Sequence, residues 1–291
     1  MSGLAFVGAG EVARIFASGI REHVRATGEE VTIRGYTAGR RHRPPYDPGY
    51  RAECAAAGIE LVDSAAEALA GADIVFSSVV ADQAEAVGGW IAESVEPGAV
   101  VVDLNATTPE VIRGIAAAVR ARGARFVDAS IMDTVPVFRM GVPLLLSGDT
   151  EAFPAVALGF TNTRDLHAEA GVASSAKVLR SVVMKALEAS LVESFTAARA
   201  LGIEEVVADS VIGTFDSTTP GRTLVEDLVS SQRLHARRRA AEMDGAVRTL
   251  EQLGVGSSVS AGTRDHLRRV AAEREAETAS RTCAETESAP A

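Results

Sequence analysis

The chain has 291 residues, 47% of them hydrophobic and 23% charged, which is typical of a folded globular protein with one large or two ordinary domains. Its net charge of -10 argues against nucleic acid as a partner, because a phosphate backbone requires a basic surface. The two cysteines cannot form a disulfide framework and no apolar run reaches the roughly 18 residues of a membrane span, so the composition predicts a cytoplasmic protein.

Residues 1 to about 150 alternate short β-rich runs with Ala-rich helical runs. This alternation predicts an α/β fold, a doubly wound parallel Rossmann sheet with helices on both faces. The predicted strands are Leu4–Val7, Val31–Tyr36, Ile59–Val62, Asp73–Val79, Val100–Asp103 and Arg125–Asp128, with a further strand near Pro143–Leu146. The predicted helices lie near 11–24, 50–57, 64–70, 82–95 and 108–122.

After about residue 165 the pattern becomes entirely helical. The helical runs lie near 172–201, 203–213, 222–253 and 262–275, and Gly- and Pro-containing segments separate them. The sequence therefore predicts a nucleotide-binding domain over 1–163 and an all-α domain over 164–274. The polar tail, 275–291, is predicted to be disordered.

A glycine-rich motif follows the first predicted strand. Gly8-Ala9-Gly10-Glu11-Val12-Ala13 has the Gly-x-Gly-x-x-Ala form of the dinucleotide fingerprint. Gly8 permits a tight turn and Gly10 lets the backbone approach a pyrophosphate. Ala13 allows close packing of helix on strand, and the helix N-terminus offers free N–H groups to the phosphates. We therefore expect this loop to bind a dinucleotide.

The end of the second strand indicates which dinucleotide. An NAD site usually places Asp or Glu there to bind the ribose 2′-hydroxyl. Here Thr37 is followed by Arg40 and Arg41, with no carboxylate. Because a guanidinium group binds phosphate bidentately, we predict NADP(H) as cofactor, with NAD(H) possible. The alternative is a solvated basic loop in an Arg-rich chain.

Lysine is rare in this chain. Of 29 Lys+Arg residues only Lys177 and Lys185 are lysines, and both lie in one predicted helix. Arginine can supply a positive charge, but only a desolvated lysine readily gives up its proton. This pattern favours an active site on that helix over two surface lysines that lie together by chance.

These motifs together resemble the β-hydroxyacid dehydrogenase superfamily, the relatives of 6-phosphogluconate and 3-hydroxyisobutyrate dehydrogenases, over about residues 3–270. The resemblance is carried by the glycine loop, Asp103-Leu104-Asn105-Ala106-Thr107, Asp128-Ala129-Ser130, and Gly171 followed by Lys177. It is closest to a branch with a compact helical C-terminal domain, of which the segment Leu234–Met243 is typical.

The resemblance implies specific roles. Lys177 would be the catalytic lysine, Asn105 and Thr107 would lie near the nicotinamide, and Val79 and Val80 would line the crevice beside the adenosine and ribose. The active site would lie between the two domains, and the protein would be a homodimer through its helical domain.

The chain departs from the family in two places. The family follows the Asp128-type strand with Ser-Gly-Gly, whereas this chain has Met132-Asp133-Thr134. The family also has Asn four residues after the lysine, where this chain has Ser181, a hydroxyl with fewer donors. The substrate is therefore expected to differ from those of the well-known members.

Several side chains are candidates for binding a small anionic substrate. The candidates are Ser130, Asp133, Thr134, Ser181, Lys185, His235 and Arg238. Lys185 would anchor an anionic group or instead pair with Glu188 one turn on, and Asp133 would bind substrate or cap a loop. His235 and Arg238 would reach the site or form a solvated basic face, and Trp90 is interpreted as packing.

The sequence thus predicts an NADP(H)-dependent oxidoreductase without a metal. It would move hydride between nicotinamide and a β-hydroxy or β-keto acid, with Lys177 as general acid and base. An imine reductase on the same fold and a non-catalytic NADP(H)-binding sensor remain as alternatives. Imine reductases often have Asp or Tyr at the position of Lys177, so the lysine argues against the first.

Overall fold

The computed structural model describes residues 3–39 and 42–287, with side chains described as far as residue 280. The chain divides into two compact units, 1–181 and 182–291. This boundary falls inside a helix, whereas the sequence pattern places the change of domain at 163/164. The difference arises because the first turns of that helix pack on the sheet, which a change in composition does not reveal.

Unit 1 contains an eight-stranded sheet with strand order β3-β2-β1-β4-β5-β6-β7-β8. All neighbouring strands are parallel except β6 and β7, which are antiparallel. This mostly parallel sheet confirms the predicted Rossmann fold. The strands are β1 (Gly3–Val7), β2 (Thr32–Tyr36), β3 (Glu60–Leu61), β4 (Ile74–Ser77), β5 (Val100–Asp103), β6 (Arg125–Ile131), β7 (Leu144–Gly148) and β8 (Thr163–Asp165).

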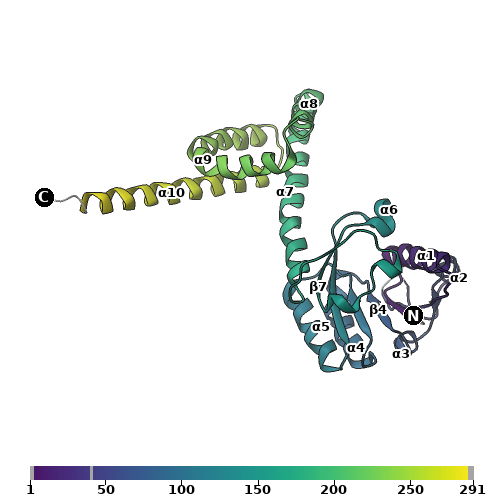
Figure 1. Ribbon diagram of the computed structural model, residues 1–291. Coiled ribbons are helices and arrows are strands. Elements are labelled where there is room, and N and C mark those ends of the chain that lie inside the picture. Colours follow the sequence, from purple (N-terminus) through teal and green to yellow (C-terminus); the bar gives the residue numbers. More distant parts are fainter. Residues whose placement is uncertain (1–2, 40–41, 288–291) are drawn as a thin grey trace. The chain divides into compact units, whose positions relative to one another are not determined.

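Helices cover both faces of this sheet (Figure 1). One face packs on α1 and α2 around Phe6, Phe16 and Phe76, and the other on α3, α4 and α5 around Val75, Ile91 and Ile112. Strands with two covered faces are mostly apolar, as the central strands β1, β4 and β5 are. The helices of this unit are α1 (Glu11–Ala26), α2 (Pro48–Ala56), α3 (Ala65–Leu69), α4 (Ala84–Ser94), α5 (Pro109–Ala121) and α6 (Val135–Phe138).

Local capping explains where several helices begin. Asp47 accepts hydrogen bonds from the N–H groups of Gly49 and Tyr50, so α2 starts two residues earlier than the sequence pattern predicts. Ser64 and Thr108 cap α3 and α5 in the same way. The short strand β8 was not predicted, since its three residues carry no alternation or apolar run.

The sheet changes direction between β1 and β4. The chain runs from β1 outward to β2 and β3, then returns to the other side of β1 and continues to β8. In open α/β sheets, ligands bind beyond the carboxyl ends of the strands at such a switch point. The end of β1 is where the glycine motif begins.

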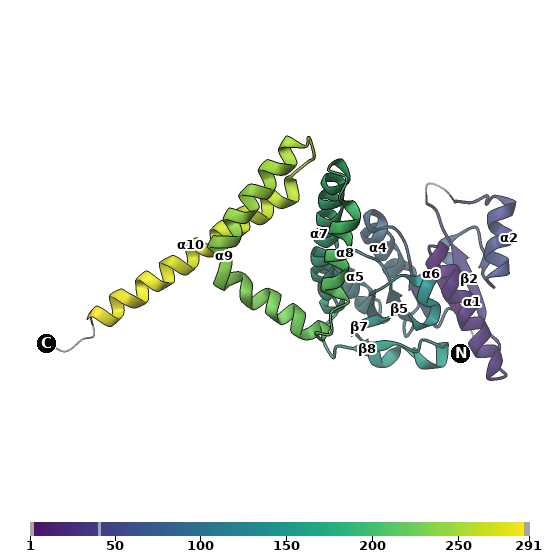
Figure 2. The same cartoon turned by 90° about the horizontal axis from the view of Figure 1, so that it is seen from above.

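Unit 2 is helical and contains the second part of α7 (Val172–Ala200), then α8 (Glu204–Phe215), α9 (Gly221–Gln252) and α10 (Ser258–Glu287). Helices α9 and α10 pack side by side through Ala236, Ala240 and Leu267 (Figure 2). Glu193 on α7 accepts the N–H groups of Val259 and Ser260 at 3.1 and 3.0 Å and so caps α10.

Helix α10 corrects the sequence prediction for the C-terminal segment. The sequence predicted a helix near 262–275 and disorder over 275–291, but α10 continues to Glu287. Its polar composition lacks an apolar stripe, so the pattern hid the length of this helix, which forms ion pairs with α9 as far along as Glu277. Within the described ranges, no helix is long and apolar enough to cross a membrane.

Candidate functional site

A cavity of about 610 Å³ lies at the switch point of the sheet. The loops that follow β1, β2 and β4 border it, together with one side of α4. Its lining includes these residues that the sequence predicted for cofactor binding: Gly8, Gly10, Glu11, Val12, Thr37, Val79 and Val80. The structure therefore brings three of the four predicted cofactor segments to one cleft.

The two glycines of the motif have different structural roles. Gly8 has φ +91, and a Cβ there would lie 2.0 Å from the carbonyl oxygen of Ser78, so only glycine fits. Gly10 precedes α1, and a Cβ there would meet no protein atom within 4 Å because the position faces open space. Ala9 and Ala13 are fully buried. This geometry fits a pyrophosphate that approaches the backbone at the start of α1.

Two aromatic side chains belong to the cleft, and sequence reasoning assigned neither to it. Tyr36 and Trp90 both line it, with ring centroids 6.0 Å apart. Trp90 was predicted to be packing only, because nothing in the sequence places α4 beside the end of β2. Flat apolar walls of this kind suit a planar ring such as adenine.

Two further tyrosines hydrogen-bond the backbone of the loops that border the cleft. The Tyr50 hydroxyl donates to the carbonyl oxygen of Ala9 at 2.8 Å. The Tyr46 oxygen lies 3.2 Å from both the N and the O of Thr37 and 3.1 Å from the carbonyl oxygen of Val62. Burial raises the pKa of both phenols, so both hydroxyls keep their protons and remain donors.

The remaining cofactor candidates fall into two groups. Asn105 is buried and links strand ends: its Oδ1 accepts from Val79 N at 2.6 Å and its Nδ2 donates to Ser77 Oγ at 2.8 Å. Asn105 and Thr107 are not among the residues that line the cavity. Arg40 and Arg41 lie outside the described residues.

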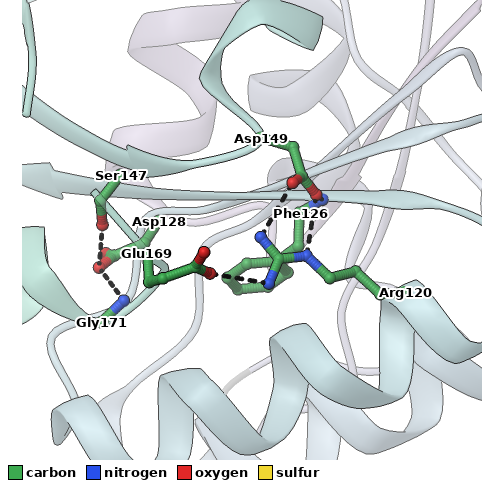
Figure 3. Close-up of polar contacts among 7 residues, drawn as sticks. All are labelled: Arg120, Phe126, Asp128, Ser147, Asp149, Glu169 and Gly171. Atoms are coloured by element: carbon green, nitrogen blue, oxygen red, sulfur yellow. Dashed lines mark hydrogen bonds and ion pairs between the residues drawn. The ribbon is translucent and has the colours of Figure 1, made fainter. Parts of the chain in front are cut away.

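Asp128 connects the sheet to the start of α7. Its Oδ2 accepts the Gly171 N–H at 3.0 Å and the Ser147 hydroxyl at 3.1 Å (Figure 3). The Ser174 N–H also donates to Oδ2, at 3.0 Å, and the Ser174 hydroxyl donates to Oδ1 at 2.8 Å. A buried carboxylate at a helix N-terminus satisfies free N–H groups and interacts favourably with the helix dipole. Asp128 therefore fixes the helix that carries Lys177.

A second carboxylate, Asp149, comes directly after the end of β7. Asp149 accepts from Arg120 Nη2 at 2.9 Å and from Phe126 N at 2.9 Å, while Arg120 also reaches Glu169 at 3.4 Å (Figure 3). Arg120 helps to hold the pKa of Asp149 below its usual range although burial opposes this. Gly171, at φ +97 and closely packed on Pro109, lies in the chain between Glu169, which contacts Arg120, and Ser174, which contacts Asp128.

Lys177 is half-buried on the first turns of α7. Burial lowers the pKa of its ammonium group below the ordinary value, and the negative charges of Asp128 and Asp103 oppose this shift. Burial also raises the pKa of Asp103 to about 7 although Asn105 donates hydrogen bonds to it. A lysine that releases its proton more easily than usual is suited to general acid and base chemistry.

The substrate candidates of unit 1 make local contacts. The Ser130 hydroxyl lies 3.5 Å from Asp128 Oδ1 and is buried. Asp133 accepts from the N–H of Thr134 at 2.7 Å, which is the loop-cap alternative. The Ser181 hydroxyl donates to the carbonyl oxygen of Lys177 at 2.9 Å, back onto its own helix.

The candidates of unit 2 also have protein partners. Lys185 pairs with Glu188 at 2.9 Å, as the alternative interpretation of this residue stated. His235 and Arg238 line a groove of about 930 Å³ on α9 and α10, rich in arginine. Arg238 forms an ion pair with Glu242.

Comparisons with known proteins agree with the fold. The model for the NAD binding domain of 6-phosphogluconate dehydrogenase matches residues 46–165, and a domain of unknown function, DUF1932, matches 198–270. No protein of curated function matches the sequence. A conserved hypothetical protein from Sinorhizobium meliloti 1021 is 30% identical over 92% of this chain and 88% of its own, with a TM-score of 0.58.

Two further solved structures are informative. The conserved protein MTH1747, described as similar to 3-hydroxyacid dehydrogenases, is 26% identical over 93% of this chain and 98% of its own, with a TM-score of 0.58. A reductive aminase from Aspergillus terreus shares the fold at 18% identity over 93% of this chain and 94% of its own, with a TM-score of 0.73. On its fold, its cleft and these matches, the chain belongs to the β-hydroxyacid dehydrogenase superfamily of NAD(P)-dependent dehydrogenases and reductases.

Proposed function

We propose that this protein transfers hydride between NADP(H) and a β-hydroxy or β-keto acid, or a related small anion, with Lys177 as general acid and base. The single observation that carries the proposal is the half-buried Lys177 ammonium, whose pKa burial lowers, at the start of a helix fixed by Asp128. Such a group exchanges its proton more readily than a surface lysine.

The cofactor cleft fits a dinucleotide, since Gly8 forms the turn and Gly10 leaves open space at the start of α1. The bound cofactor supplies or accepts the hydride at the substrate carbon. In the reductive direction Lys177 Nζ gives its proton to the oxygen that gains charge, and the amine then takes a proton from solvent. In the oxidative direction the neutral amine removes the hydroxyl proton. Both directions need Lys177 within hydrogen-bond reach of that oxygen.

The preference for NADP(H) is supported by the composition of the loop after β2. Thr37 lines the cleft where an NAD site usually has a carboxylate, and Arg40 and Arg41 follow it in the sequence. The Aspergillus terreus reductive aminase was also crystallised with NADPH. Titration of the protein with both cofactors tests the preference. Tighter binding of NADH than of NADPH would contradict it.

Imine reduction is the second candidate activity. Imine reductases from Bacillus cereus and Streptomyces aurantiacus share the fold, each with a TM-score of 0.69, at 17% and 19% identity. Lys177 favours a hydroxy or keto substrate, since a lysine ammonium can donate the proton that the alkoxide oxygen takes up when a keto group is reduced. A screen of hydroxy acids, keto acids and imines, followed at the nicotinamide absorbance band, separates the two. Turnover of none would favour a non-catalytic NADP(H)-binding sensor.

Self-association is proposed through the helical unit. Helices α7, α8 and α9 carry large apolar side chains that are more than half exposed, which is unusual for a monomer. They include Val182, Val183, Val192, Val206, Ile212, Phe215, Val225, Leu228 and Val229. A homodimer that buries this surface would have twice the 30.2 kDa mass of one chain, which light scattering measures directly.

Cys54 is free and buried, which fits a reducing, cytoplasmic location.

A further inference from the structure

We propose that Tyr46 and Tyr50 are positioning residues for the cofactor, Tyr50 through the pyrophosphate loop and Tyr46 through the loop that selects between NADPH and NADH. The inference deepens the proposed NADP(H) function and rests on it. Neither side chain lines the cleft. Each acts through a hydrogen bond to the backbone of a residue in a bordering loop, Ala9 or Thr37.

Tyr50 fixes the direction of one peptide plane. Its hydroxyl donates to the Ala9 carbonyl oxygen at 2.8 Å, a contact between residues 41 positions apart in the chain. In a planar trans peptide, the N–H of the next residue points opposite to that carbonyl. The Gly10 N–H is therefore held away from Tyr50, at the position where the cleft is open. This orientation presents a donor to the pyrophosphate, a group that NADPH and NADH share.

Tyr46 fixes the backbone of the residue that follows β2. Its oxygen accepts from Thr37 N and lies equally close to Thr37 O, at 3.2 Å in both cases. In an extended chain the N–H and C=O of one residue point the same way, so a neighbouring strand would normally bind both. The Tyr46 hydroxyl takes the place of that strand. It also lies 3.1 Å from the carbonyl oxygen of Val62, in the segment after β3. Thr37 thereby keeps a fixed position at the end of β2.

Both tyrosines are rigid supports. Tyr46 and Tyr50 are 7% and 4% exposed, and Tyr50 belongs to α2, whose first turn Asp47 caps. The ring of His42 stacks on Tyr50 with centroids 3.6 Å apart. A support that does not move transmits its hydrogen-bond geometry to the loop.

The test compares dissociation constants of NADPH and NADH for the wild type, Tyr50→Phe and Tyr46→Phe. Tyr50→Phe should raise both constants by a similar factor, about 3- to 10-fold. The variant no longer orients the Gly10 N–H toward the pyrophosphate, which both cofactors contain. Tyr46→Phe should raise the constant for NADPH about 3- to 10-fold and that for NADH less than about 2-fold, so the ratio between the cofactors falls. A purely structural role of either tyrosine would lower thermal stability and leave both dissociation constants at wild-type values.

Thr27→Val is the matched control. It removes one hydroxyl that donates to a backbone carbonyl, that of Val24 at 2.7 Å, at the opposite end of α1 from the glycine loop. Both constants should stay at wild-type values. If Tyr50→Phe and Tyr46→Phe also bind both cofactors as the wild type does, the proposal is wrong. If the wild type prefers NADH, the cofactor assignment fails, and Tyr50→Phe still decides its own part because the pyrophosphate is common.

Discussion

Asp103, the last residue of β5, and Asp128, in the middle of β6, are register partners, and the charges of both act on Lys177. Asp128 is held by hydrogen bonds from the start of α7, whereas burial raises the pKa of Asp103 to about 7. The pair therefore combines one carboxylate that anchors the lysine helix with one that carries a proton near neutral pH.

Substitution of Lys177 tests the proton transfer directly. Lys177→Ala should lower turnover about 10²- to 10⁴-fold, the usual contribution of general acid–base catalysis, and leave the dissociation constant of NADPH unchanged. Lys177→Arg should be similarly slow, because a guanidinium group does not give up its proton. The control is Arg180→Ala, which removes an exposed cation three residues further along the same helix. Full activity of Lys177→Ala would contradict the mechanism.

Asp128 should influence the pH dependence of the reaction. Its negative charge raises the pKa of Lys177, so Asp128→Asn should lower that pKa further. The reductive direction uses the protonated amine, so its rate should decline at a lower pH in Asp128→Asn than in the wild type. The measurement is the pH profile of the reductive rate.

The matched control for this prediction is Asp149→Asn. It removes a carboxylate that comes directly after β7 and pairs with Arg120, and it should cost a comparable amount of stability, about 1–3 kcal/mol. Asp149 is not among the charges that shift the pKa of Lys177, so the pH profile of the reductive rate of Asp149→Asn should keep the wild-type midpoint. An identical shift in both variants would point to general loosening of the fold.

Asp103 should make stability depend on pH. Its pKa rises from 3.8 to about 7 on folding, so the folded state retains a proton that the unfolded state releases. The stability from this group is fully present below about pH 4 and is lost as the pH rises through about 7, by at most about 4 kcal/mol. Asp103→Asn cannot titrate. The free energy of unfolding of the wild type, relative to this variant, should therefore fall between pH 4 and 8; parallel curves would refute the shift.

Trp90 should report cofactor binding. It is the single tryptophan of the chain and lines the cleft beside Tyr36. NADPH should therefore quench its fluorescence in a saturable way, with energy transfer to the nicotinamide absorbance band. Adding inorganic phosphate alone should cause no comparable change. An unaltered emission spectrum at saturating NADPH would place the cofactor elsewhere.

Thr37→Asp should reverse the cofactor preference. Its carboxylate would accept from the ribose 2′-hydroxyl of NADH and repel the 2′-phosphate of NADPH, as in NAD-specific sites. We expect NADPH affinity to fall about 10-fold or more, since like charges a few ångströms apart cost on the order of 1–2 kcal/mol at a protein surface. Thr37→Asn, which has the same shape without the charge, is the control. Equal effects of the two substitutions would exclude charge as the cause.

Much of the nucleotide-binding unit could be read from local pattern. The apolar runs, the helical periodicity and the Gly8–Ala13 motif each depend on residues close together in the chain, and the strands of that motif's sheet were found at nearly their observed positions. The rarity of lysine drew attention to Lys177, because residue counts can be read from the sequence without a structure. Strand β8 and the C-terminal part of α10 were missed, since neither carries a distinctive local pattern.

The contacts between distant segments came only from the tertiary structure. The sequence marked Asp128 and Gly171 as landmarks, but because they are 43 residues apart it did not show that they are hydrogen-bonded. The same holds for Tyr50 and Ala9, and for Trp90 beside Tyr36. Sequence alone determined the fold class and the type of each chemical group, because both follow from local propensity and composition. Which group lies beside which was decided by the crossover of the sheet, because that folding step brings remote strand ends together and buries their side chains.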